Sequence, residues 1–151
     1  DEMKKSYDKQ ASSLNMNGND SITDAKIFSK ISQDDLVKMG IGLFMYFLND
    51  DYAQKFRKML TIEQFSNKEL AELFSKQYYD APISYQSAMF AMLTANCVLT
   101  DNNPDVMALQ FYAPIFMILT ICDREPHREK ELTALLEKHI RQFSKIYSRG
   151  E

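Results

Sequence analysis

Hydrophobic residues recur along this 151-residue chain at the three- and four-residue spacing of helices, and no stretch alternates as a half-buried strand would. The first such run, Met3, Tyr7, Ala11 and Leu14, predicts a helix at the start of the chain. Residues 36–48 contain one charged side chain, which predicts a helix buried on most sides. We therefore expect an all-α fold, an antiparallel bundle of about six or seven helices.

Short polar segments between these runs predict where helices begin. Ser66-Asn-Lys-Glu69 has the form of a capping box flanked by Phe65 and Leu70 as a hydrophobic staple, so a helix should begin at Ser66. Residues 32–35 form a similar box, in which the acid at the third helical position is aspartate, a less effective partner than glutamate. Asn49-Asp-Asp should end one helix and cap the next, and Asn103 followed by a proline should cap another.

Residues 80–82, Asp-Ala-Pro, allow two interpretations. Proline is tolerated in the first turn of a helix and Asp80 can cap, so a new helix can begin there. The same proline can instead kink one continuous helix. The sequence leaves both open.

Residues 106–122 carry no charge over 17 positions. The length approaches that of a membrane span, but Gln110 and Pro114 lie within the run, acids flank it, and no cluster of Lys or Arg would orient it. We expect instead a helix buried on all sides, in a large bundle or half covered by a partner subunit. Pro114 cannot donate to the carbonyl of Gln110, which leaves a spare acceptor in this helix.

Composition and charge narrow the function. The formal charge is −3, and the 18 basic residues are mixed with 21 acids, which argues against nucleic-acid binding by this segment itself. Two cysteines cannot form a disulfide framework, so we expect a reducing, cytoplasmic location.

The sequence offers no constellation of catalytic residues, and we expect no enzyme activity. Gly40-x-Gly42 lacks a third glycine and a preceding strand, so it predicts close helix packing rather than a nucleotide loop. His127 and His139 have no further ligands at metal-binding spacing, and we expect neither a metal nor a cofactor.

Methionine and aromatic residues are abundant on the central helices. They can simply form the core, or they can line an adaptable pocket for a small apolar ligand, because methionine packs loosely and accepts varied partners. The candidate pocket residues are Phe44, Met45, Met59, Phe65, Tyr85, Met89, Met92, Phe111 and Tyr112.

The order of elements resembles the C-terminal regulatory domain of TetR/AcrR-type transcriptional repressors over residues 1–147. The resemblance is carried by residues 56–74, by residues 101–116 with their Asp-x-x-Pro opening, and by a closing helix with one apolar stripe. It implies that residues 1–20 form a connecting helix and that residues 21–151 bind a small-molecule effector and dimerise. Operator DNA would be bound by a helix-turn-helix preceding the chain.

The resemblance also implies a homodimer. The helices at about 104–122 and 128–147 would pack with their copies as a four-helix bundle. Interface residues would be Ile115, Ile118, Leu119, Leu132, Leu136, His139 and Phe143. The alternative is a stand-alone helical interaction or scaffold protein that does not bind DNA, and neither interpretation places the chain in a membrane.

Overall fold

The computed structural model describes residues 31–149, and every regular element within that range is a helix. The elements are α3 (Gln33–Asn49), α4 (Asp51–Glu63), α5 (Lys68–Ser75), η1 (Lys76–Asp80), α6 (Ala81–Ala95), α7 (Pro104–Arg124), η2 (Pro126–Arg128) and α8 (Glu129–Tyr147). The predicted all-α class is confirmed. Because α5, η1 and α6 are continuous, the described part holds five helices besides the short 3₁₀ turn η2. The predicted helix over residues 1–14 and the connecting helix of residues 1–20 lie outside it.

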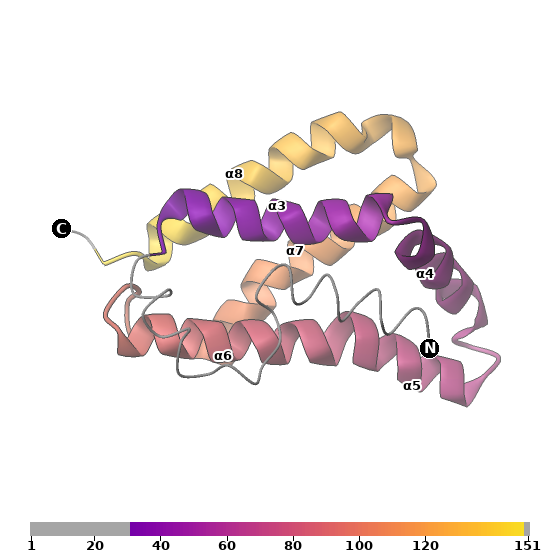
Figure 1. Ribbon diagram of the computed structural model, residues 1–151, viewed down its shortest axis with the longest axis horizontal. Helices are drawn as coiled ribbons and strands as arrows, with labels where there is room; N and C mark the ends of the chain where they lie inside the picture. Colours follow the sequence, from indigo (N-terminus) through magenta and orange to yellow (C-terminus); the bar gives the residue numbers. More distant parts are fainter. Residues whose placement is uncertain (1–30, 150–151) are drawn as a thin grey trace.

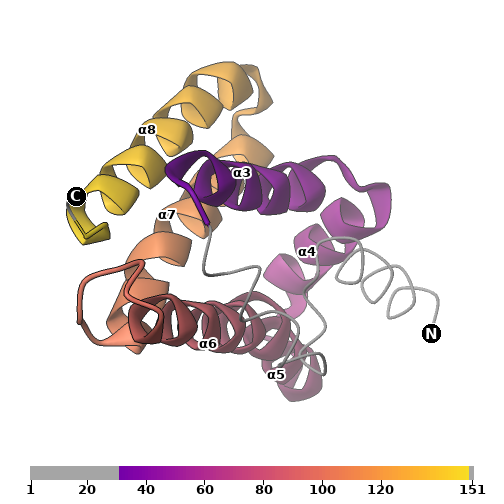
Figure 2. The ribbon, with the colours of Figure 1, turned by 60° about the vertical axis from the view of Figure 1, so that its left-hand side comes forward.

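Helix α7 is the central element of the bundle. It crosses from the side of α6 to the side of α8, so that α3 and α8 lie together on one side of the molecule and the α5–α6 helix on the other (Figure 1). The turned view shows the same order, with α4 closing one end between α3 and α5 (Figure 2). Every other long helix therefore packs against α7 or against a helix that touches it.

Two predicted helix starts are confirmed by their hydrogen bonds. The Asp50 side chain accepts from the Ala53 amide at 2.8 Å, which caps α4. The Asn103 side chain caps α7, with Pro104 as the first helical residue. At these positions a short polar side chain satisfies amide groups that the helix itself leaves free.

The predicted capping box at Ser66 is wrong. The cap of α5 is Asn67, whose side chain accepts from the Leu70 amide, while the Ser66 hydroxyl turns back to Glu63. The box predicted at residues 32–35 is confirmed at the start of α3, where Ser32 and Asp35 bond each other's backbone amides. Asparagine caps a helix as well as serine does, so the spacing of the motif alone did not decide whether Ser66 or Asn67 caps α5.

The helix that begins with α5 neither restarts nor breaks at Pro82. Asp80 makes no capping bond, and the backbone passes through the π-helical segment η1, where the Ala81 amide reaches the Lys76 carbonyl. Proline has no amide hydrogen for the carbonyl four residues earlier, so the turn before it widens. This widening keeps one continuous helix.

Gly40 brings α3 close to its neighbours. A side chain there would collide with Ile140 of α8 and press on the Phe111 ring of α7. The predicted role of the Gly40–Gly42 pair in close packing is thus confirmed for Gly40, whereas Gly42 faces open space.

Candidate functional site

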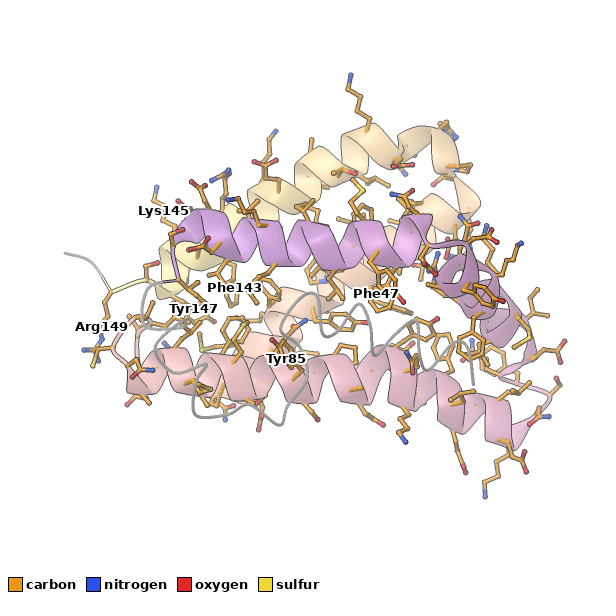
Figure 3. All side chains as sticks on the ribbon, viewed as in Figure 1. Phe47, Tyr85, Phe143, Lys145, Tyr147 and Arg149 are labelled. Atoms are coloured by element: carbon orange, nitrogen blue, oxygen red, sulfur yellow. The ribbon has the colours of Figure 1, made fainter. Side chains whose placement is uncertain are left out.

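Four of the predicted pocket residues belong to one buried core between α3, α6 and α7. Phe44, Met89, Phe111 and Tyr112 are buried there, and Met45, Tyr85 and Met92 lie half buried around them. Phe47 from α3, Tyr85 from α6 and Phe143 from α8 lie along this interior (Figure 3). Met59 and Phe65 do not join the group: Phe65 is 91% exposed in the turn after α4.

The core contains polar atoms among its apolar side chains. Gln86 of α6 is only 3% exposed, and its Oε1 atom has no hydrogen-bond partner among the described residues. The Thr94 hydroxyl is also buried without a hydrogen-bond partner among the described residues. A buried acceptor without a donor costs free energy, so Gln86 is a position where a donor from a ligand would be favourable.

A buried ion pair fixes one end of the bundle. The guanidinium of Arg57 in α4 is 0% exposed and bonds both carboxylate oxygens of Asp123 in α7, at 2.7 and 2.6 Å. Its third branch donates to the Phe47 carbonyl in the last turn of α3. A planar guanidinium satisfies such a fork of acceptors. One side chain thus ties together α3, α4 and α7.

Aromatic side chains pack beside this ion pair. Tyr78 of η1 is buried against Phe47 and Phe74, with ring centroids 5.7 and 5.2 Å apart. Burial raises the pKa of Tyr78 well above its ordinary value, although the positive charge of Arg57 opposes this. Its hydroxyl therefore remains protonated and serves packing and hydrogen bonding rather than acid–base chemistry.

Sequence reasoning missed Arg57. The signal was present: on α4 it is the one charged residue among the positions that face inward, next to Phe56 and one turn from Leu60. A charge on the apolar side of an amphipathic helix requires a buried partner. The partner, Asp123, lies 66 residues further along the chain, so no local pattern points to it.

Six of the seven predicted dimer residues are buried inside the single chain. Ile115, Ile118, Leu119, Leu132, Leu136 and Phe143 are between 0 and 4% exposed, and His139 is half buried. The six buried residues face the other helices of the same chain, so a second copy could not reach them without rearranging the bundle, whereas part of His139 stays accessible. The surface of α7 and α8 that remains accessible lies elsewhere.

The opposite side of α7 carries an exposed apolar stripe. Its members follow the helical spacing of three and four residues. Three of them are large: Val106 is 47% exposed, Leu109 is 53% exposed and Met117 is 56% exposed. Ala113, also exposed, lies at the middle of the stripe. The adjoining edge of α8 adds Leu135 and Ile146, 53 and 61% exposed. We call Val106, Leu109, Ala113, Met117, Leu135 and Ile146 the outer face.

His139 lies on α8 between Leu135 and Ile146, the two outer-face residues of that helix, and its Nε2 atom is buried without a hydrogen-bond partner among the described residues. Burial lowers the pKa of the imidazole, while the nearby backbone of Phe111 and Gln110 acts in the opposite sense. Gln110 is the residue whose carbonyl Pro114 cannot bond, so the expected spare acceptor lies beside a histidine. The Gln110 side chain accepts from the Tyr147 hydroxyl.

A shallow open groove of about 600 Å³ lies between α3 and α8, bounded by Met45, Pro126, Thr133 and Ala134 among others. In the described range, no three His, Cys, Asp or Glu side chains gather as metal ligands would. In that same range α7 alone is long and apolar enough to cross a membrane by length and composition, a property that core helices share.

No protein-family model matches the chain, and no curated protein or solved structure shows significant similarity to it.

Proposed function

We propose that this chain is the regulatory, dimerising part of a transcriptional regulator of the TetR/AcrR type. The observation that carries the proposal is the outer face: the charge-free helix α7 exposes an apolar stripe in addition to its buried side, and the adjoining edge of α8 adds Leu135 and Ile146. Exposed apolar surfaces of this kind are typical of protein–protein contacts. In this proposal operator DNA is bound by a preceding helix-turn-helix, as the resemblance implies.

The occupant of the outer face in this proposal is a second copy of the chain. Ala113 lies at the middle of the stripe, where a small side chain lets two helices approach closely. In an antiparallel pair, the exposed Arg124 at the end of one α7 would approach the acidic start of the other, which carries Asp101 and Asp105. This complementarity of charge and of helix dipoles favours a two-fold, self-complementary contact.

Cysteine cross-linking tests the dimer. In a Cys97→Ser background, Ala113→Cys should form a disulfide-linked dimer under mild oxidation, because equivalent residues meet near a two-fold axis. Met117→Cys, one turn further along α7, extends the test in case the axis lies off Ala113. The matched control is Lys58→Cys, an exposed position on α4. Cross-linking at α7 no stronger than at Lys58 would contradict the proposal.

The effector part of the proposal rests on Gln86. A small apolar compound with one hydrogen-bond donor would satisfy the Oε1 atom of Gln86 within a core of methionine and aromatic side chains. Thermal unfolding of the chain with a panel of lipophilic alcohols and amides tests this. Some members should raise the melting temperature by mass action, and Gln86→Leu should remove that rise.

A stand-alone helical interaction protein is the alternative. It would use the same outer face but would not respond to small apolar compounds. Dimerisation together with a flat response across the panel would favour it.

A further inference from the structure

The exposed Glu131 and Lys138 lie one turn to either side of Leu135 on α8, and His139 lies half buried on the edge of α8 that borders the outer face. Leu135 precedes it by one turn and Ile146 follows it by two, so the three residues share one side of the helix. Its ring lies 6.4 Å from the Phe143 ring, and the Nε2 atom is out of contact with solvent. Part of the side chain is still accessible in the single chain. A second copy on the outer face would cover that part.

The elements packed against α8 supply no negative charge to this ring. Residues 106–122 of α7 are uncharged, and that helix presents only the backbone of Gln110 and Phe111 to the imidazole. From α3, the carboxylate of Asp34 is paired with Arg141 at 2.9 Å. From η2 come His127 and Arg128, the latter paired with Glu125 and Glu131. An imidazolium at this position would have no carboxylate to compensate its desolvation.

We infer that His139 makes the pairing of two copies sensitive to pH, because a dimer would bury its imidazole beside an uncharged helix and would therefore exclude the protonated form. This inference rests on the proposed dimer and adds a regulation to it. Mild acid separates the copies, and neutral pH restores the pairing.

The sign follows from the direction of the pKa shift. Burial already lowers the pKa of His139 in the single chain, and pairing would lower it further. At a pH well above the ordinary pKa of histidine the ring is neutral in every state and pairing is at full strength. As the pH falls below that value, the separated chain takes up the proton first, and pairing weakens.

The chain contains two histidines, which gives a matched control. Sedimentation equilibrium at pH 7.5 and pH 5.5 would be run on the native chain, on His139→Gln and on His127→Gln, since His127 is exposed in η2. We expect the dimer dissociation constant of the native chain and of His127→Gln to rise at least about tenfold at the lower pH, the equivalent of one pKa unit. In His139→Gln the rise should be absent.

The possible failures are distinguishable. A native chain that is monomeric at both pH values would overturn the proposed dimer and this inference with it. A dimer whose dissociation constant does not change with pH would overturn the inference alone. If His139→Gln does not fold, the comparison of the native chain with His127→Gln still decides. Loss of the pH dependence in His127→Gln would show that His127 causes it, and would overturn the inference.

Discussion

The two sides of α7 are both apolar, yet they have different surroundings. The inner side carries Phe111, Ile115 and Leu119, which are buried against α3, α6 and α8. The outer side carries Val106, Leu109 and Met117, which are about half exposed. A helix of a single-chain bundle needs one apolar side only. The second apolar side is not covered by any of the described helices, and the proposed pairing of two copies would cover it.

The difference also lies in how specifically each side is packed. The inner side fits aromatic rings edge to face, as with Phe111 and Phe90 at 5.5 Å, and it requires a glycine opposite, Gly40. The outer side is aliphatic, with a small residue at its middle. We expect substitutions on the inner side to change the free energy of unfolding and those on the outer side to change association.

The largest effect should come from the ion pair at the C-terminal end of α7. Asp123→Ala leaves the guanidinium of Arg57 buried without its partner, so the free energy of unfolding should fall by about 3–5 kcal/mol. Urea denaturation followed by circular dichroism measures this. Asp51→Ala, which breaks the exposed pair with Lys55, is the control and should change little. Equal losses in the two variants would show that Arg57 finds other partners.

The next effect compares the two sides of α7 directly. Ile115→Ala removes a buried side chain and should lower the free energy of unfolding by about 2–5 kcal/mol. Met117→Ala, two residues further on and half exposed, should change the unfolding of the dissociated chain by no more than about 0.5 kcal/mol. Denaturation at a concentration low enough to dissociate any dimer separates stability from association. A large loss in Met117→Ala under those conditions would place the outer face within the monomer core.

The smallest effect concerns the two glycines of α3. Gly40→Ala should destabilise the chain by about 1–3 kcal/mol, because its methyl group overlaps Ile140. Gly42→Ala faces open space and should stabilise the chain by roughly 0.5–1 kcal/mol through helix propensity. Thermal melting of both variants against the native chain measures the opposite signs. A stabilised Gly40→Ala would mean that α3 and α8 can separate at little cost.

Much of the fold was predictable because it depends on local chemistry. The spacing of apolar residues gave the helices, and Asp50 and Asn103 were assigned as caps because a short polar side chain at a helix start acts on its own neighbours. Ser66 was assigned wrongly because Asn67 competes for the same role one residue later. Arg57 and Asp123, 66 residues apart, meet only through the tertiary fold, which no local pattern encodes.

The predicted dimer residues also show that tertiary contacts cannot be assigned from local sequence patterns. Charge-free helices signal burial, but composition does not tell whether a chain's own helices or a partner covers a given side. Ile115 and Met117 are neighbours in one apolar run, and only the packing of α3, α6 and α8 assigns one to the core and the other to the surface. Phe65 shows the opposite case: the sequence predicts it in a pocket, but the side chain lies in an exposed turn.

The central claim is that the outer face joins two copies of the chain, and the molar mass in solution tests it most directly. Sedimentation equilibrium at neutral pH should give twice the chain mass of 17.6 kDa for the native protein and the single mass for Met117→Glu. Ile62→Glu, on the exposed side of α4, controls for the added charge and should remain dimeric. A native chain of single mass, or a dimer that survives Met117→Glu, would contradict the account.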